Sequence, residues 1–142
     1  MVRRVAVKIR IGTLLSGDYE EDDSGKHVVV NGKKIYRVNV VGTVMNVYSG
    51  GNLMIVLDDG SGVVRVKFFD SFPEVSVGDI VRVVGKVRKD DDIYILGETL
   101  CKITDPNEEL LWRAEASQFS TTTSEHEEQT EEKNIFIEED VV

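Results

Sequence analysis

LMIVLDDGSGVVRVKFF, residues 53–69, is the stretch that decides the fold. Every second residue of 53–57 and of 64–68 is a large apolar side chain. This period of two is typical of strands with one buried face. The DDGSG between the two runs is rich in residues that favour tight turns. The stretch therefore predicts a pair of antiparallel strands.

Similar runs lie on both sides of this pair. HVVVNGKKIY, residues 27–36, places Asn31-Gly32 between two short β-prone runs, which is the strongest two-residue hairpin signal. The second of these runs continues to Met45, and Gly42 inside it indicates a bulge or a sharp bend. Further alternating runs follow near 81–88 and 93–103. Five strands with short turns predict an all-β barrel or sandwich.

The N-terminal part is expected to extend this core. Apolar residues at 5, 7, 9 and 11 predict one more strand, and SGDYEEDDSG, residues 16–25, predicts an acidic loop. We therefore divide the chain into an N-terminal extension with a hairpin arm over 1–33 and a barrel over 34–104.

The C-terminal part has a different character. Asp105 suits an N-cap and Pro106 the first helical position, so we predict a helix over 105–119. Its aromatic stripe must pack on something, because so short a helix does not stand alone in water. Residues 120–142 are rich in Ser, Thr and Glu and are expected to form a disordered acidic tail.

Charge is distributed unevenly along the chain. The formal net charge is −9, but residues 120–142 hold eight acids and one lysine, whereas 26–102 hold eleven basic and nine acidic residues. The barrel region can therefore accept phosphates. Cys101 is the single cysteine, which excludes an internal disulfide and predicts a buried, inert thiol. Without a signal peptide or a long apolar run in the sequence, a cytoplasmic location is expected.

No residue pattern indicates catalysis. His27 and His126 lie in the hairpin arm and the tail, and neither has an acid or nucleophile partner at a useful spacing. Asp58 and Asp59 are adjacent, so turn formation explains them better than paired acid–base chemistry. We therefore predict a protein that is not an enzyme and has no cofactor and no metal site.

The motifs, taken in order, resemble a known family. VNVVGTVMNV, LDDGSGVVRVKFFD, VGDIVRVVGKVR, IYILGE and DPNEELLWRAE resemble the OB-fold domains of replication protein A, especially its middle and small subunits and the archaeal single-OB forms. Telomere-capping OB subunits look similar too. The resemblance covers about Ile9 to Phe119. It implies a five-stranded OB-fold barrel and non-catalytic binding of single-stranded DNA in replication, repair and recombination, near the nucleoid. It also implies a C-terminal helix that bundles with partner subunits.

Binding of single strands without sequence preference needs cations for phosphates and aromatic faces for bases. Strand parity places Arg65, Lys67 and Phe69 on the outer side of their strand and assigns Phe68 to the core. Phe69 then stacks on a base or packs against the helix or the N-terminal segment. The candidate nucleic-acid-binding residues are Tyr48, expected in the turn after the first barrel strand, and, on the strands, Arg37, Met54, Arg65, Lys67, Phe69, Arg82, Lys86, Arg88 and Tyr94. The alternative for each cation is a solvated outer surface.

Several alternatives stay open. Leu111, Trp112, Ala116 and Phe119 are the candidate partner-binding residues, unless the helix covers an end of its own barrel. KDDD, residues 89–92, is expected to repel phosphates, which also suits a scaffold subunit with little DNA contact. An RNA-binding module is a further possibility. The acidic tail could compete with DNA or present NIFIEEDVV to replication and repair proteins.

Overall fold

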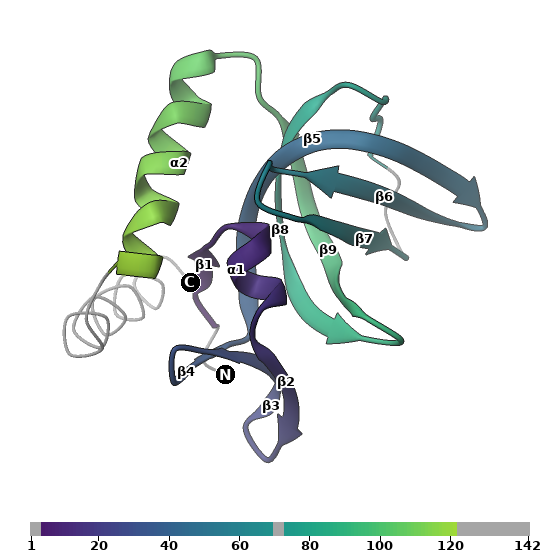
Figure 1. Ribbon diagram of the computed structural model, residues 1–142. Coiled ribbons are helices and arrows are strands. Elements are labelled where there is room, and N and C mark those ends of the chain that lie inside the picture. The colour runs from purple at the N-terminus through teal and green to yellow at the C-terminus, as the bar shows by residue number, and fades with distance from the viewer. Residues whose placement is uncertain (1–3, 70–72, 122–142) are drawn as a thin grey trace.

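Five long strands close into a barrel in the computed structural model, which describes residues 4–69 and 73–121 and, within that range, the side chains up to residue 118 (Figure 1). The strands are β5 (Arg37–Gly50), β6 (Asn52–Asp58), β7 (Val63–Phe68), β8 (Ile80–Lys89) and β9 (Ile93–Lys102). Their order is β5-β6-β7-β9-β8, and β8 pairs back to β5. This is the predicted OB-fold. The predicted disordered tail lies outside the described residues.

Strand β5 serves both halves of the barrel. Its first half, Arg37 to Thr43, pairs with β8, and the part from Thr43 to Gly50 pairs with β6. The irregularity expected at Gly42 occurs at Met45, where the register with β6 shifts. Gly42 instead allows β5 and β6 to approach each other closely, because a Cβ there would lie 3.1 Å from the Asp58 carbonyl oxygen. The bulge bends the strand so that it can serve both sides.

Alternation along the strands fills the barrel interior. The predicted inward residues of β6 and β7 are all buried: Leu53, Ile55, Leu57, Val64, Val66 and Phe68. Phe68 is 1% exposed and reaches Gly97 of β9, where a Cβ would lie 2.4 Å from its ring. The core therefore needs a glycine at position 97 to hold this aromatic ring. The opposite side chains of both strands face outward.

The turn between β6 and β7 ties the N-terminal segment to the barrel. Asp59 accepts hydrogen bonds from the Ser61 amide through Oδ1 and from the Ile11 amide through Oδ2, the latter at 2.8 Å. The turn role predicted for Asp59 is therefore confirmed. The predicted N-terminal strand is wrong beyond β1 (Ala6–Lys8), because α1 (Ile11–Leu15) begins at this contact and buries Ile11 and Leu14.

A second, three-stranded sheet follows α1. It consists of β2 (Asp18–Asp22), β3 (Gly25–Val30) and β4 (Lys33–Ile35). The predicted hairpin at Asn31-Gly32 is confirmed, since both residues have positive φ. The predicted loop over 16–25 is wrong, because half of it, Asp18–Asp22, pairs with β3 as strand β2. The pairing also places Glu20 opposite His27, so the expectation that this histidine lacks an acid partner is wrong.

Helix α2 (Pro106–Thr121) packs on the outside of its own barrel. Figure 1 shows it on the left of the molecule, whereas β6 and β7 extend to the right. Trp112 is 5% exposed and donates its indole N–H to Asn39 Oδ1 at 3.1 Å, and Ala116 is fully buried. The partner-binding role predicted for Trp112 and Ala116 is therefore wrong, because their own barrel covers them. Leu111 is exposed, and the Phe119 side chain lies outside the described part.

Two further sequence predictions concern exposure and membranes. Cys101 is exposed, not buried, because its pairing with Arg82 places it on the outer face near the end of β9. Within residues 4–69 and 73–121, the structure shows no helix of the length and apolarity that a membrane crossing requires.

Candidate nucleic-acid interface

One outer face of the barrel gathers the predicted binding side chains of three strands. Strand register aligns Met54 of β6 with Lys67 of β7, and Lys67 with Leu96 of β9. The neighbouring row aligns Val56 with Arg65. We call this surface the basic-aromatic face; it carries Met54, Val56, Arg65, Lys67 and Tyr94. All five side chains are half-buried, so they lie along the sheet surface instead of projecting into solvent.

The two cations of the basic-aromatic face lie over one aromatic ring. Lys67 Nζ lies 4.3 Å from the centroid of the Tyr94 ring, and Arg65 Cζ lies 5.6 Å from it. These distances are within the range of cation–π attraction. Tyr94 therefore helps to hold both cations in place, and its ring is partly covered by them.

Asp90 binds both of these cations from the loop between β8 and β9. The Arg65 guanidinium donates to both carboxylate oxygens, at 3.0 and 2.6 Å, and Lys67 Nζ donates to Oδ2 at 2.7 Å. Hydrogen bonds from Arg65, Lys67 and the Asp92 amide hold the pKa of the Asp90 carboxyl far below its ordinary range. The face thus contains an anion that its own chain supplies.

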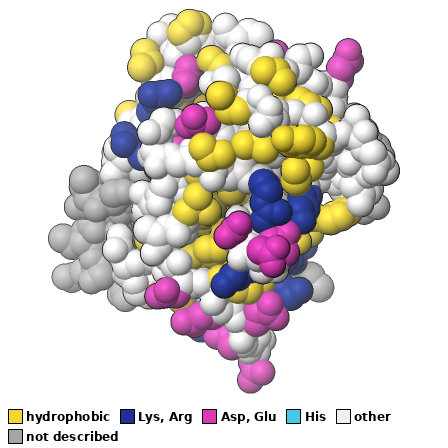
Figure 2. Space-filling model, turned by 45° about the vertical axis from the view of Figure 1, so that its right-hand side comes forward, with side chains coloured by type: hydrophobic (Ala, Val, Ile, Leu, Met, Phe, Trp, Pro, Cys, Tyr) yellow, Lys and Arg dark blue, Asp and Glu magenta, His cyan; other side chains and the backbone are white. Residues whose placement is uncertain are grey.

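The role expected for the acidic loop changes accordingly. The sequence predicted that the loop repels phosphates, whereas Asp90 forms ion pairs with Arg65 and Lys67, two of the cations predicted to bind them. Sequence reasoning missed this contact, because 23 and 25 residues separate Asp90 from these cations. Figure 2 shows Lys and Arg side chains grouped directly beside Asp and Glu side chains, next to a hydrophobic stripe.

Two exposed aromatic side chains lie at the edges of this surface. Tyr48 is 52% exposed and pairs with Met54, on β5 itself and not in the turn that follows it. Phe69 is 45% exposed and follows the last residue of β7, while its neighbour Phe68 is buried as predicted. Both rings are accessible to a ligand, which is the geometry that base stacking requires.

Arg37 and Arg82 lie apart from the basic-aromatic face and have partners elsewhere in the chain. Arg37 has the predicted outward parity, but it is only 6% exposed, because Nη1 donates to the Arg4 carbonyl and Nε to Glu98. Arg82 forms an ion pair with Glu108 of α2 at 3.0 Å. The binding role predicted for Arg37 is therefore wrong, and Arg82 is engaged with the helix.

Strand β8 extends the outer surface beyond β9. Lys86 is exposed and pairs with Leu96, which continues the row of Met54 and Lys67. Arg88 pairs with Tyr94 and donates a hydrogen bond to the Val87 carbonyl. A groove of about 500 Å³ adjoins Arg65, lined among others by α1, the start of β7 and the acidic loop.

Comparisons with known proteins agree with this architecture. Residues 38–97 match the family model described as an OB-fold nucleic acid binding domain. An uncharacterized protein of Methanocaldococcus jannaschii is 32% identical over 103 residues, which cover 71% of this chain and 42% of that protein. This chain thus spans less than half the length of that curated relative.

Solved structures with the same architecture include two complexes. A chain of a replication protein A heterotrimer bound to single-stranded DNA superposes with a TM-score of 0.73 at 20% identity, covering 83% of this chain and 97% of that chain. A chain of the Schizosaccharomyces pombe Stn1–Ten1 complex gives a TM-score of 0.72 at 21% identity, with coverage of 81% and 90%. At these identities the likeness shows the fold.

Proposed function

We propose, from the premise that this chain is an OB-fold protein resembling subunits of replication protein A, that it binds single-stranded DNA without catalysing a reaction. The observation that carries the proposal is the basic-aromatic face, where Arg65 and Lys67 lie over the Tyr94 ring and the exposed rings of Tyr48 and Phe69 lie at the edges. Cations beside aromatic faces are what sequence-tolerant binding of single strands needs. In this role the chain acts as one subunit of a replication-protein-A-like complex in replication, repair and recombination.

The contact with Asp90 supports an anionic ligand. Arg65 already binds a carboxylate in the two-point geometry that guanidinium groups also use for phosphate, and Lys67 shares the same oxygen. A phosphate of a bound strand can take this place if the acidic loop releases the cations. DNA binding by this face is therefore a competition between a phosphate and Asp90.

Titration with labelled oligonucleotides tests the proposal. We expect the full chain to bind oligo-dT more tightly than duplex DNA at two salt concentrations, with affinity that falls as salt rises. Tighter binding of oligo-U than oligo-dT would instead indicate an RNA-binding module. No binding of any of the three would favour a scaffold that joins partner proteins, a reading that the neutralised cations also support.

A single substitution locates the binding surface. Phe69→Ala should weaken oligo-dT binding by about 1–3 kcal/mol, the usual contribution of one stacked base. Leu111→Ala is the matched control, because Leu111 is also exposed but lies on α2, away from the face. Equal affinity of the folded Phe69 variant and the wild type would remove Phe69 from the site.

The subunit role rests on a different surface. Leu110 and Leu111 of α2 are 64% and 63% exposed, while Trp112 of the same helix is buried against the barrel. We propose that these two leucines contact another subunit of the complex. Mixing the chain with its candidate partner subunits and measuring the size of the assembly tests this, with Leu110→Glu/Leu111→Glu expected to prevent assembly. Unchanged assembly of that variant would exclude this surface.

A further inference from the structure

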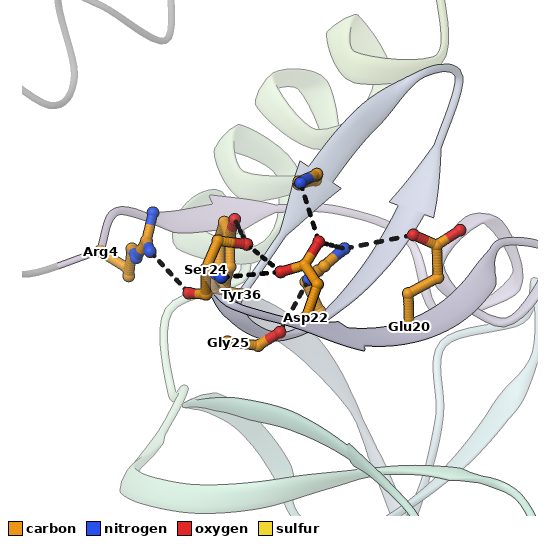
Figure 3. A network of polar contacts seen from close by, with 8 residues as sticks. Arg4, Glu20, Asp22, Ser24, Gly25 and Tyr36 are labelled. Carbon is orange, nitrogen blue, oxygen red and sulfur yellow. Dashed lines mark hydrogen bonds and ion pairs between the residues drawn. The ribbon is translucent and has the colours of Figure 1, made fainter.

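A cluster of polar side chains on the small sheet lies apart from the basic-aromatic face. It contains Glu20 and Asp22 of β2 and His27 of β3. Figure 3 shows this network, with Arg4, Ser24 and Tyr36 on one side of Asp22 and Glu20 on the other. The proposed DNA interface uses none of these residues, so their arrangement calls for a separate explanation.

His27 is completely buried and has an unsatisfied nitrogen. Its side chain is 0% exposed, and Nε2 has no hydrogen-bond partner among the described residues. A buried polar atom without a partner costs free energy, so native proteins rarely keep one without a reason. An unpartnered Nε2 therefore indicates a ligand that the protein chain itself does not provide.

The other ring nitrogen defines the state of the imidazole. Nδ1 lies 3.1 Å from the Gly25 carbonyl oxygen, and a carbonyl can only accept a hydrogen bond, so Nδ1 carries the hydrogen. In the neutral ring this assignment places the lone pair on Nε2. Histidines that bind metals typically have their second nitrogen fixed by a backbone carbonyl in this way.

The Nε2 atom of His27 faces two carboxylates. Nε2 lies 3.6 Å from Glu20 Oε1 and 3.8 Å from Asp22 Oδ2, and the three atoms lie within 4.8 Å of one another. These separations are too long for hydrogen bonds. They are close to the separation of roughly 3.4 Å between neighbouring ligands of a tetrahedral metal ion with bonds of about 2.1 Å.

Strand pairing and hydrogen bonds hold the carboxylates in place. Glu20 pairs directly with His27 across β2 and β3, and Asp22 lies two residues further along the same face. The Ser24 amide and hydroxyl both donate to Asp22 Oδ1, which leaves Oδ2 facing the ring. Ser24 is itself bound by Tyr36 and Arg4. The second oxygen of Asp22 is thus preoriented toward His27.

Lys34 is a further partner of the Asp22 carboxylate. Lys34 Nζ lies 3.0 Å from Oδ2, the same oxygen that faces His27. Lys34 therefore competes for this oxygen with any other cation.

We propose that His27 Nε2 and the carboxylates of Glu20 and Asp22 bind one divalent transition-metal ion of the Zn²⁺ class. One imidazole nitrogen with two carboxylate oxygens suits Zn²⁺, whereas Mg²⁺ and Ca²⁺ prefer oxygen ligands alone. Glu20 and Asp22 are both exposed, so water can complete the coordination. The ion would clamp β2 to β3 and add stability to the small sheet.

Zinc titration of the full chain tests the site, with a chromophoric chelator as competitor. The background chain is Cys101→Ser/His126→Asn, which removes the exposed thiol and the histidine of the acidic tail. We expect this chain to bind one Zn²⁺ ion and not to bind Mg²⁺. Glu20→Gln and Asp22→Asn should each weaken the binding at least tenfold. Lys34→Met should tighten it, because the competing ammonium group is gone.

A spectroscopic measurement on the unaltered ring covers the case in which these variants misfold. In ¹⁵N NMR spectra of the wild-type chain, saturating Zn²⁺ should shift the His27 Nε2 resonance while Nδ1 keeps its hydrogen. A His27 spectrum that Zn²⁺ leaves unchanged would overturn the proposal. Loss of the zinc binding in the background chain would overturn it as well, because the ion would then belong to Cys101 or His126.

Discussion

Asp90 determines how much positive charge the basic-aromatic face offers to a ligand. Its two oxygens bind Arg65 and Lys67, so both cations of the face are already paired. Surface ion pairs of this kind contribute little to stability, because water solvates the separated charges well. Under the proposed function their main consequence concerns binding, since a phosphate competes with this carboxylate for both cations.

Removing this charge should strengthen DNA binding. For Asp90→Asn we expect oligo-dT affinity at low salt to rise roughly two- to fivefold, which is the value of one exposed ion pair. Fluorescence anisotropy measures the change, and Asp105→Asn, outside the face, controls for the loss of one negative charge. Equal gains in both variants would mean that net charge alone is responsible.

The same contact should survive mild acid. Because the pKa of Asp90 lies below that of a free aspartate, its carboxylate stays ionised as pH falls through the ordinary range near 4. The ion pairs formed above that range therefore persist at pH 4 and are lost only in stronger acid. Carboxyl ¹³C NMR shifts should show no titration of Asp90 down to pH 3. In Arg65→Gln, which removes the hydrogen bonds that lower the pKa of Asp90 most, this pKa should rise.

At the scale of elements, the packing of α2 on the barrel depends chiefly on one aromatic side chain, Trp112. Trp112 and Ala116 attach the helix to β5 through burial and through the bond to Asn39. Trp112→Ala should lower the free energy of unfolding by about 3 kcal/mol, because it leaves a cavity and removes the hydrogen bond. Urea unfolding monitored by circular dichroism measures it. Leu111→Ala, next to it but exposed, should leave stability almost unchanged.

The sequence predicted the elements whose signals are local. The Asn31-Gly32 hairpin and the strands β6, β7 and β8 follow from turn residues and from a period of two, which need no knowledge of distant residues. Strand β2 escaped prediction because its five residues, DYEED, carry no apolar alternation and are held by pairing with β3. The long strand β5 was anticipated, but its bulge lies three residues beyond Gly42.

For the candidate site, the sequence could predict only which strand side chains point outward. Alternation placed Arg65 and Lys67 outward, and the structure agrees. Nothing local could reveal that the N-terminal segment covers Arg37, because the Arg4 carbonyl lies 33 residues away along the chain. The outward direction of a strand residue follows from its sequence, whereas its exposure depends on what packs above it.

At the scale of the whole molecule, charge separates the barrel from the C-terminal residues. Residues 125–142 contain eight acids and one lysine, and this excess accounts for most of the net charge of −9. Deleting these residues should tighten oligo-dT binding at low salt and change it little at high salt, because long-range repulsion is screened. Anisotropy titrations at both salt concentrations measure this. Equal affinities of both chains at low salt would show that the acids do not compete.

The barrel closes where β7 and β9 run parallel, and among the described residues two pairs, Val66 with Ile95 and Lys67 with Leu96, join them. The other barrel strand pairs form longer antiparallel ladders. Amide protons along this short seam should thus exchange with solvent sooner than those of the ladders. Lys67 is part of this seam. A nucleic acid bound across it would therefore hold together two strands that the backbone joins through only a short stretch of pairing.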